Sequence, residues 1–414
     1  MARKPTRTNL SVLAQLCNLI PAFLVPKIAR QSGVDKKART FSPWSHLVTL
    51  LYAQFTHALS LNDVSDALKN HAPKLLRIRD AVAPSKNAFS HANRERDGDM
   101  AQTLFWEILN HLTTMCPRFG GQTFKGMPRR FKRAVYAVDS STIRLVVNCI
   151  DWARHRRRKA AAKLHLRLNL QCFLPAFAIV DTAAHNDNKR ARELCAVLEA
   201  GEIAVFDKAY LDFVHLYDLT VRGVFWVTRA KDNMQYRVKK RLLKKPDGNI
   251  LRDDLIVLTG AASRGKYPQV LRLVRAIVEV DGQEREMEFL TNNLEWAASS
   301  IADLYKSRWQ IEVFFKEIKQ TLQLCDFLGH NKNAVLWQVW TALILYVLLR
   351  FLAFANSWQH GFKRFFCLLR SSVWDGVLIS SLASLCGTAR GAPAMRAAPE
   401  QLYLPGFGPR EGRA

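Results

Sequence analysis

The sequence predicts a mixed α/β protein that begins with an all-α domain. Apolar residues recur at helical spacing up to about residue 116, and short β-branched segments alternate with helical ones from about residue 134. The stretch Leu304–Leu322 then has the period of one amphipathic helix. We expect a helical N-terminal domain at 1–118 and a catalytic core whose first part is 133–231. A β-rich insertion at 232–290 precedes the rest of the core at 291–360, and a C-terminal tail follows at 361–414.

The charge of the chain points to a polyanionic partner. The 414 residues are enough for two or three domains, and 49% are hydrophobic, so a large core is expected. Lys and Arg number 61 against 35 acids, which gives a formal charge of +26. Such a charge repels itself unless it meets an opposite one. Nucleic acid is therefore the leading partner, and an anionic membrane surface is the weaker alternative.

The cysteines and the apolar runs predict a reduced, cytoplasmic protein. None of the eight cysteines forms a C-x-x-C pair, which argues against a zinc ribbon or a disulfide scaffold. The N-terminus lacks the apolar run of a signal peptide. Val335–Ala355 is long enough to span a membrane, but Arg350 interrupts it. We expect a buried core helix here and no membrane contact.

Two short helices in the N-terminal region leave two interpretations open. Ser60–Asp63 forms a capping box, and Ser85 begins a second helix after a long loop. One interpretation is a helix-turn-helix-like DNA reader, and the other is a helical bundle with a polar face. Both expect the second helix to expose Ser85, Lys86, Asn87, His91, Arg94 and Arg96.

The core begins with a strand at Ala134–Val138 that ends at Asp139, followed by a hairpin partner at Ile143–Val147. A later strand, Ile203–Phe206, ends at Asp207. Strands at 166–173, 176–180 and 224–228 and a helix at 189–199 complete the pattern.

Four polar residues share one side of the helix predicted at Leu304–Leu322. Tyr305, Arg308, Glu312 and Lys319 fall within a sector of about 60° beside the apolar stripe. Glu317 points away from that stripe and is expected in solvent. A carboxylate ringed by Arg, Lys and Tyr at a core margin can hold a metal while the cations hold phosphates. The plainer alternative is a surface helix with ordinary ion pairs between successive turns.

The spacing of these four residues resembles the Y-R-E-K motif of DDE transposases of the insertion-sequence-4 type. The segments that begin at Asp139 (Asp-Ser-Ser-Thr) and Asp207 (Asp-Lys-Ala-Tyr) resemble the first and second catalytic aspartates of that family, although Lys208-Ala209 stands where Arg-Gly is commoner. The resemblance runs from about Arg133 to Leu322. It implies an RNase-H-like catalytic core interrupted by the insertion, and more loosely an N-terminal domain often attached to such transposases.

The resemblance also implies a metal site. Asp139, Asp207 and Glu312 would hold Mg²⁺, with Mn²⁺ able to substitute, and two such ions about 3.5–4 Å apart can activate one oxygen and stabilise another. Asp181 and Asp187 are competing acids near a strand end, and a turn or a helix cap explains each of them as well. The role of His185 stays open.

Basic and aromatic residues are expected to contact DNA. The resemblance implies that Arg308 and Lys319 contact phosphates near the scissile bond and that Tyr305 hydrogen-bonds the same backbone. Arg229 and Lys231 resemble the family's T-R-x-K motif and are assigned to the DNA backbone, with a solvated loop as the alternative. Trp309 is a candidate to stack an extruded base, and structural packing is the alternative role for its ring. Some relatives carry a Trp on the strand before this helix, but 286–290 contains none. The Arg154–Lys159 run is either a DNA-facing loop or a solvated face. The full set of expected DNA contacts is Tyr305, Arg308, Lys319, Arg229, Lys231, Lys163, Arg94 and Arg96.

The expected function is that of a cut-and-paste DNA transposase of an insertion sequence. Its partners would be the double-stranded transposon ends and target DNA, bound by a homodimer at the bacterial nucleoid. Hydrolysis would nick the end, and the freed 3′-OH would attack the other strand or the target. The alternatives are a transposase-derived repressor that binds without cutting and a metal-dependent nuclease that cuts without joining.

Overall fold

The computed structural model describes eight segments of the chain, and all that follows concerns these segments. They are residues 4–34, 40–121, 126–145, 149–156, 159–182, 187–280, 283–324 and 327–386.

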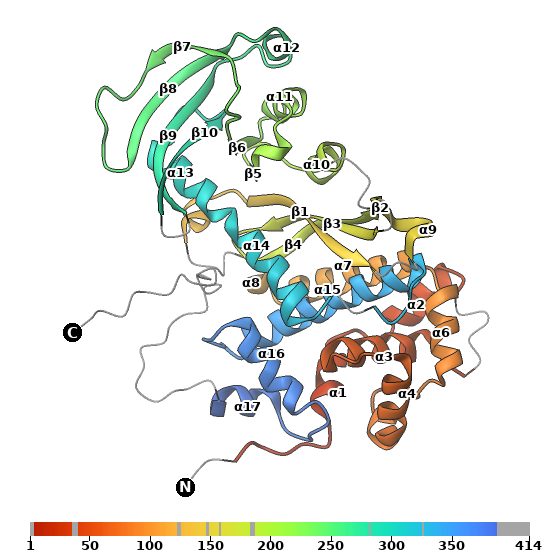
Figure 1. Cartoon of the computed structure of the whole chain (residues 1–414). Coiled ribbons are helices and arrows are strands. Elements are labelled where there is room, and N and C mark those ends of the chain that lie inside the picture. Colours follow the sequence, from red (N-terminus) through yellow and green to blue (C-terminus); the bar gives the residue numbers. More distant parts are fainter. Residues whose placement is uncertain are drawn as a thin grey trace.

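The molecule has a helical part and a part built on one large sheet (Figure 1). Helices from both ends of the chain form the helical part. They are α1 (Val12–Cys17), α2 (Leu24–Gln31), α3 (Pro43–Thr56), α4 (Leu61–Asn70), α5 (Ala72–Leu76), α6 (Lys86–Glu95), α7 (Gly98–Met115), α8 (Pro117–Gly120), α15 (Lys332–Ala355), α16 (Phe362–Ser371) and α17 (Ile379–Cys386).

The predicted helix starts of the N-terminal region are confirmed. Ser60 accepts a hydrogen bond from the Asp63 N–H at the start of α4, and Ser85 accepts one from the Ala88 N–H at the start of α6. Each serine satisfies one of the backbone donors that a helix leaves without an intrahelical partner. The short α5 lies between them, so α4 and α6 are not joined by a single tight turn.

Ten strands form the sheet. They are β1 (Val135–Leu145), β2 (Arg154–Arg156), β3 (Lys159–Asn169), β4 (Leu174–Thr182), β5 (Ile203–Phe206), β6 (Phe225–Arg229), β7 (Tyr236–Arg241), β8 (Ile250–Leu258), β9 (Leu271–Val280) and β10 (Gln283–Thr291). Their order is β2-β3-β1-β5-β6-β10-β9-β8-β7, with β4 also paired to β3. Two single-turn helices, α9 (Ile150–Ala153) and α12 (Ala261–Arg264), lie in connections between strands.

The centre of the sheet has the predicted RNase-H-like arrangement. Strands β1, β3 and β4 pair antiparallel, and β5 and β6 follow β1 as parallel neighbours. The predicted hairpin partner at Ile143–Val147 is wrong, because β1 continues without a turn to Leu145 and pairs with β3 along its length.

The β-rich segment at 232–290 is an extension of the core sheet. Its last strand, β10, pairs antiparallel with β6, so β7–β10 continue the sheet beyond the core strands. The insertion therefore shares backbone hydrogen bonds with the strand that follows the second aspartate.

Each face of the central sheet is covered by different helices. Because side chains alternate along a strand, Val135, Val205 and Val227 face α13 (Ala298–Ser307) and α14 (Trp309–Lys316) in one core. Alternate residues of the same strands, including Phe206 and Trp226, face α10 (Asp187–Cys195) and α11 (Phe213–Val221) in a second core.

The helix predicted at Leu304–Leu322 is present but interrupted. A turn at Arg308 separates α13 from α14, and the last turn, η5 (Glu317–Thr321), is a π-helix. A π-turn holds one residue more than an α-turn, so it shifts the residues that follow it around the helix axis. The positions of Lys319 and its neighbours therefore differ from those on a regular wheel.

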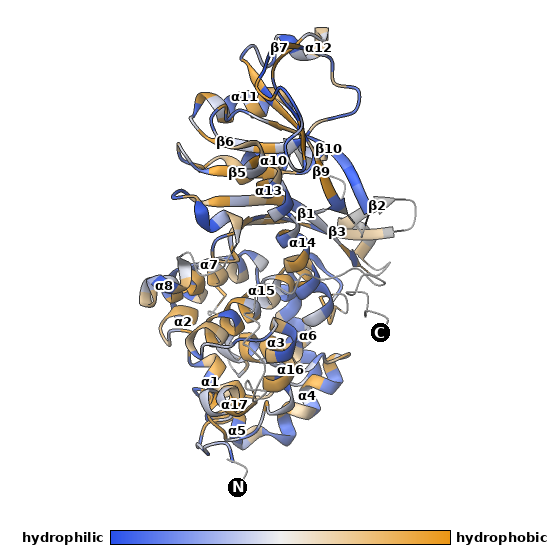
Figure 2. Cartoon of the chain, turned by 90° about the vertical axis from the view of Figure 1, so that its left-hand side faces the viewer, coloured by the Kyte–Doolittle hydropathy of each residue, from blue (hydrophilic) through white to orange (hydrophobic). Residues whose placement is uncertain are grey.

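Helix α15 lies inside the helical part, as expected. It is long and apolar enough to cross a membrane, yet 94% of its most apolar stretch is buried within the protein. It packs against α7, α3 and α6, so it joins the N-terminal helices, although it was expected with the catalytic core. In Figure 2 the hydrophobic colour follows the central strands and α15.

The C-terminal segment is folded up to Cys386, whereas 361–414 was expected as a tail. Arg7 pairs with Val377, and the Thr8 N–H donates to the carbonyl oxygen of Gly376 over 2.9 Å. A Cβ at residue 376 would lie 2.4 Å from the Thr8 carbonyl oxygen, so only glycine allows this approach. Residues 387–414 of the expected tail lie outside the described residues.

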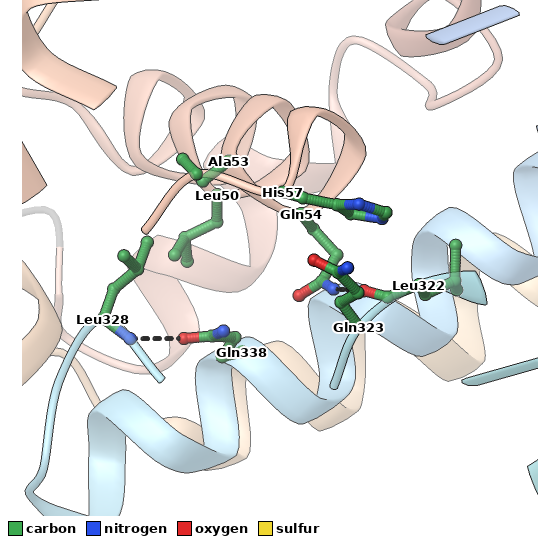
Figure 3. Close-up of a pocket in the computed structure, with 9 residues that line it drawn as sticks. Leu50, Ala53, Gln54, His57, Leu322, Gln323, Leu328 and Gln338 are labelled. Carbon is green, nitrogen blue, oxygen red and sulfur yellow. Dashed lines mark hydrogen bonds between the residues drawn. The ribbon is translucent and has the colours of Figure 1, made fainter. Parts of the chain in front are cut away.

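A small cavity lies where α3 meets the end of η5 (Figure 3). Its volume is about 10 Å³, room for about one water molecule. Gln54 and His57 from α3 and its C-terminus line it together with Leu322 and Gln323. Gln54 Nε2 donates to the Leu322 carbonyl oxygen, and His57 Nε2 lies 3.0 Å from the Thr321 carbonyl oxygen. The N-terminal helices therefore hold the end of the predicted helix directly.

Candidate catalytic site

The two predicted aspartates lie side by side at one edge of the parallel strands. Val138 of β1 is opposite Phe206 of β5, and Phe206 is opposite Thr228 of β6. The next residues on these three strands are Asp139, Asp207 and Arg229. Because they follow one row of the sheet, their side chains share the face that α13 and α14 cover.

The helix contributes three of its polar residues to this edge. The Tyr305 hydroxyl donates to Oδ1 of Asp207 over 3.3 Å. Arg308 donates from Nη1 to Oδ2 of Asp139 over 3.0 Å and from Nη2 to Oε1 of Glu312 over 3.1 Å. Asp139, Asp207 and Glu312 are thus linked to one helix segment, although 68 and 105 residues separate them in the sequence.

The turn at Arg308 lets its guanidinium reach into the core margin. Arg308 and Tyr305 are each only 6% exposed, and Tyr305 packs against Phe289 of β10 with ring centres 4.9 Å apart. The insertion therefore supports the helix through its last strand. Arg308 and Tyr305 were expected to contact DNA phosphates, but here they face the acids.

The acids share one electrostatic environment. Burial raises the pKa of Asp139 to about 6, although the nearby Arg308 and the Ser140 N–H favour its charged form. Asp207 and Glu312 add to the rise, because a second and third negative charge disfavour ionisation of the first. This concentration of carboxylates would be relieved by a bound cation.

A metal cluster is not preformed. Within the described segments, no three acidic, histidine or cysteine side chains lie close enough together to hold a metal ion. The Arg308 guanidinium bridges Asp139 and Glu312 and supplies the positive charge between them. The three carboxylates are nevertheless the oxygen ligands that Mg²⁺ and Mn²⁺ prefer, so the donor set fits once Arg308 moves aside.

Lys319 of η5 contacts β1 at Thr142, three residues beyond Asp139. Its Nζ donates to the Thr142 carbonyl oxygen over 2.5 Å, and Lys163 of β3 is opposite Thr142 in the sheet register. Burial lowers the pKa of Lys319, and Arg144 lowers it further. Arg144 is exposed on β1 and was not among the predicted contacts. Its place on the strand of Asp139 is the signal that could have identified it.

Arg229 ends β6, the strand beside Asp207, and Lys231 follows that strand. The Thr228 hydroxyl donates to the Asp207 carbonyl oxygen over 3.4 Å, which holds the end of β6 against the second aspartate. Lys231 is exposed, and its Nζ donates to the Leu211 carbonyl oxygen over 3.3 Å. Both cations therefore border the acidic edge from the β6 side.

The polar face of α6 exposes five of the six residues expected there. Arg94 is exposed and donates to Glu95 over 2.8 Å. Arg96, in contrast, is only 8% exposed and donates to the carbonyl oxygens of Phe41 and Ser42. The expectation that Arg96 reaches DNA is not met, because its donors hold the chain before α3 in place.

The remaining expectations concern the competing acids, the basic run, His185 and Trp309. Asp181 is 14% exposed at its side chain and is engaged by Arg190, two strands away from β1. The side chains of Asp187 and of the Arg154–Lys159 run, and His185 as a whole, lie outside the described residues. Trp309 is 40% exposed beside Arg308, so its ring is accessible.

Glu317 was expected in solvent, and this is wrong. Its carboxylate lies 2.6 Å from Arg350 of α15, and the two side chains are 12% and 13% exposed. Because η5 is a π-turn, Glu317 faces the helical part, where an arginine 33 residues later in the chain neutralises it.

Comparison with known proteins agrees with this geometry. The family described as Transposase DDE domain matches residues 130–348, and a domain of unknown function (DUF4372) matches residues 8–78. The putative transposase y4zB of Sinorhizobium fredii is 34% identical over 59% of this chain and 68% of its own length. The probable transposase for insertion sequence element IS5377 of Geobacillus stearothermophilus is 30% identical over 54% of this chain and 58% of its own.

A more distant relative belongs to the insertion-sequence-4 group. The transposase InsG for insertion sequence element IS4 of Escherichia coli is 25% identical over 46% of this chain and 43% of its own length. The family match covers more than half of the chain and contains all three acids and the helix that joins them. The chain therefore belongs to the transposase DDE domain family, whose members cut and transfer DNA, and its relatives place it with transposases of the insertion-sequence-4 type.

Proposed function

We propose that this chain is a cut-and-paste transposase that binds the ends of an insertion sequence, cleaves them with Mg²⁺ or Mn²⁺ and joins them to target DNA. The observation that supports this most is that one helix segment contacts all three acids: Arg308 donates to Asp139 and Glu312, and Tyr305, three residues earlier, donates to Asp207. The acids lie on β1, directly after β5 and on α14, at one edge of an RNase-H-like sheet, which is the arrangement that the family match leads us to expect.

Transposases with this domain depend on divalent metal ions. Asp139, Asp207 and Glu312 would hold them here, and bound ions would activate the attacking oxygen and stabilise the leaving one. Arg308 would leave its bridge between Asp139 and Glu312 and turn its guanidinium to a DNA phosphate, a role that suits its paired donors. Tyr305 would keep Asp207 oriented until the duplex arrives.

The cations around this edge would hold the DNA backbone. Lys319 and Lys163 lie on the β3 side, and Arg229 and Lys231 lie on the β6 side. The exposed Trp309 is placed to stack a base that leaves the duplex, since base stacking on an aromatic ring contributes about 1–3 kcal/mol. Arg94 on the polar face of α6 would contact the transposon end in a synaptic homodimer.

The test is cleavage and joining of end-labelled transposon DNA in the presence of Mg²⁺ and a target plasmid. The wild type should give joined product. Asp139→Ala, Asp207→Ala and Glu312→Ala should each abolish cleavage and still bind the end duplex. Asp181→Ala removes an acid of the same type outside the set and should cut normally.

The same assay separates the two alternatives. Binding without cleavage by the wild type indicates a transposase-derived repressor, and cleavage without joined product indicates a nuclease. Full cleavage by any one of the three alanine variants removes that residue from the catalytic set.

A further inference from the structure

We infer that the outer strand of the insertion, β7, is a second binding surface for the phosphate backbone of duplex DNA, separate from the catalytic edge. This inference rests on the proposed function, since it extends the path of the DNA that the catalytic edge would cut. The surface comprises β7 and the turn after it and is called the basic edge below. Its cations are Arg237, Lys239, Lys240, Arg241, Lys244 and Lys245.

The basic edge concentrates positive charge in a short stretch of chain. Residues 229–245 contain eight Lys and Arg and a single acid, Asp232. All six cations of the basic edge are exposed, and none takes part in an ion pair between residues that the structure describes. A cluster of unpaired cations attracts a polyanion because the polyanion releases condensed counterions as it binds.

The neighbouring strands do not share this excess. Arg252 pairs with Asp254 at 2.9 Å, Arg272 pairs with Asp253 at 2.7 Å, and Arg275 pairs with Glu288 at 2.6 Å. Asp254 is opposite Arg241 in the register of β7 and β8, yet its carboxylate is engaged by Arg252. The acids of the insertion therefore neutralise β8, β9 and β10 and leave the charge of β7 uncompensated.

The shape of β7 suits a duplex. It is the last strand of the sheet order, so one of its edges carries no further strand, and Tyr236 and Val238 pack inward onto the second core. A bulge between Val238 and Lys240 interrupts the alternation, and three successive cations, 239–241, are exposed there. Six residues at about 3.3 Å each span about 20 Å, the length of about six phosphates of one strand.

The basic edge follows the catalytic edge along the chain, and in the sheet β10, β9 and β8 lie between β6 and β7. Arg229 ends β6 beside Asp207, exposed Lys231 follows it, and β7 begins at Tyr236. In Figure 1 β7 lies at the far end of the sheet from α14. A duplex held at the acids and running across the sheet toward its β7 end would meet β7 away from the scissile bond, so β7 would add affinity without taking part in the chemistry.

A lysine-rich edge strand also prevents two sheets from pairing edge to edge. That role requires charge on the strand but no DNA, so the two explanations predict different results. If β7 serves only as a protected edge, neutral β7 variants should self-associate and bind DNA with an unchanged salt dependence.

The test compares two quadruple variants of the full chain. One is Arg237→Gln, Lys239→Gln, Lys240→Gln and Arg241→Gln. The matched control removes four exposed cations from α2, α8 and α16 through Lys27→Gln, Arg30→Gln, Arg118→Gln and Lys363→Gln. Affinity for a fluorescent duplex of about 40 base pairs is measured from about 50 to about 200 mM salt, the range over which phosphate contacts change affinity most clearly. It is measured once with a transposon end and once with a random sequence, and light scattering reports self-association.

The β7 variant should lose more than about tenfold in affinity at about 150 mM salt, and its slope of log K against log salt should fall by about 3–4, since each phosphate contact contributes about 0.9. The control should keep its slope within experimental error. An unchanged slope in the β7 variant, or an equal loss in both variants, would overturn the inference. A loss on the end duplex alone assigns the surface to transposon DNA, and an equal loss on both duplexes assigns it to duplex of any sequence.

Cleavage separates this inference from the proposed function. At low salt, about 50 mM, and saturating short end duplex, the β7 variant should cut at the wild-type rate, because the lost contacts are then not needed for binding. Asp139→Ala should not cut and should keep the wild-type salt slope. A wild type that never cuts would contradict the proposed function and leave the salt-slope comparison of β7 intact.

Discussion

The guanidinium of Arg308 donates to the carboxylate of Asp139 over 3.0 Å, across 169 residues of chain. The same guanidinium also reaches Glu312, so one buried cation joins two of the three acids. In the absence of metal this cation offsets the repulsion that the acids would otherwise exert on each other. Arg308 therefore has one role without metal and a second one, toward DNA, in the proposed reaction.

Replacing Arg308 by Gln should expose this first role. Without the cation Asp139 and Glu312 repel each other, so we expect the free energy of unfolding of the metal-free protein to fall by about 1–3 kcal/mol. This is less than the roughly 3–5 kcal/mol lost when a fully buried pair is broken, because the Glu312 side chain is 41% exposed. Mg²⁺ should then stabilise the variant more than the wild type, because it no longer competes with a guanidinium. Thermal unfolding with and without Mg²⁺ measures both effects.

The control for this comparison is Arg94→Gln. Arg94 also pairs with a glutamate, but both side chains are more than half exposed. Such surface pairs contribute at most about 1 kcal/mol, so this variant should unfold like the wild type. Equal Mg²⁺ shifts in Arg308→Gln and the wild type would mean that Arg308 does not occupy the place of the metal.

The raised pKa of Asp139 predicts a pH dependence of stability. Its pKa is about 6 in the folded protein and near 3.8 when unfolded, so the folded state binds the proton more tightly. Proton binding by Asp139 therefore stabilises the folded state fully below about pH 4, and this stabilisation is lost as the pH rises through about 6. Its upper limit is about 3 kcal/mol. Asp139→Asn should remove this fall in the unfolding free energy of the metal-free protein between about pH 4.5 and about pH 7.

Asp212→Asn is the control, because the pKa of Asp212 is shifted in the opposite direction and its effect on stability has the opposite pH dependence. Burial alone would raise the pKa of Asp212, but Arg192 and two backbone N–H groups hold its charged form, and the pKa is lowered. That carboxylate stabilises the fold above its unfolded pKa, and the effect is lost as the pH falls. Its replacement should change the denaturation profile at the acidic end only, and a profile of Asp139→Asn identical to wild type would contradict the assignment.

The sequence was most informative where local chemistry decides the structure. Ser60 and Ser85 begin helices because a serine oxygen satisfies a free backbone N–H, and both starts are confirmed. Asp139 and Asp207 could be expected together because each comes after an apolar run in a motif that resembles the family's catalytic aspartates, although β1 continues beyond Asp139 to Leu145. None of these inferences needs a partner from a distant part of the chain.

The expectations that failed each depend on a distant partner. Glu317 looked solvated on a regular wheel, but the π-turn and Arg350 of α15 place it in the interior. Arg96 looked available to DNA, but the carbonyl oxygens before α3 take its donors. The insertion is part of the core sheet because β6, which ends at Arg229, pairs with β10, which begins only at Gln283. Local periodicity carries no information on any of these contacts.

The pair of Glu317 and Arg350 should contribute strongly to stability. Three aromatic rings, of Phe173, Tyr346 and Phe362, lie within 5.2 Å of the Arg350 guanidinium. Glu317→Gln leaves this cation without its counter-charge in an apolar site, so we expect a loss of about 3–5 kcal/mol in urea denaturation. Arg350→Met should cost a similar amount.

A double-mutant cycle distinguishes pairing from packing. If the two charges act on each other, Glu317→Gln with Arg350→Met should cost much less than the sum of the single changes. The exposed pair of Lys69 and Asp66, 3.7 Å apart, gives the matched cycle, with an expected coupling below about 0.5 kcal/mol. Additive losses at 317 and 350 would reduce the pair to two independent packing effects.

The contact between His57 and Thr321 should transmit the position of the N-terminal helices to the catalytic helix. Arg370 Nη1 lies 2.7 Å from His57 Nδ1, and a guanidinium can only donate, so Nδ1 accepts. His57 Nε2 therefore carries the hydrogen and donates to the Thr321 carbonyl oxygen at the end of η5. This tautomer ties α16, the end of α3 and the π-turn that carries Lys319 into one unit.

Arg370→Met removes the donor that fixes this tautomer and leaves the left-handed backbone of His57 unchanged. We expect amide hydrogen exchange at 317–322 to rise about tenfold or more, which corresponds to about 1.4 kcal/mol of local stability. Strand cleavage should slow while the affinity for end duplex is retained, because Lys319 loses its fixed position and Lys163, Arg229 and Lys231 keep theirs. Lys363→Met on the same helix is the control, since its side chain is exposed. Unchanged exchange at η5 in Arg370→Met would show that the π-turn is held by Glu317 and Gln54 without His57.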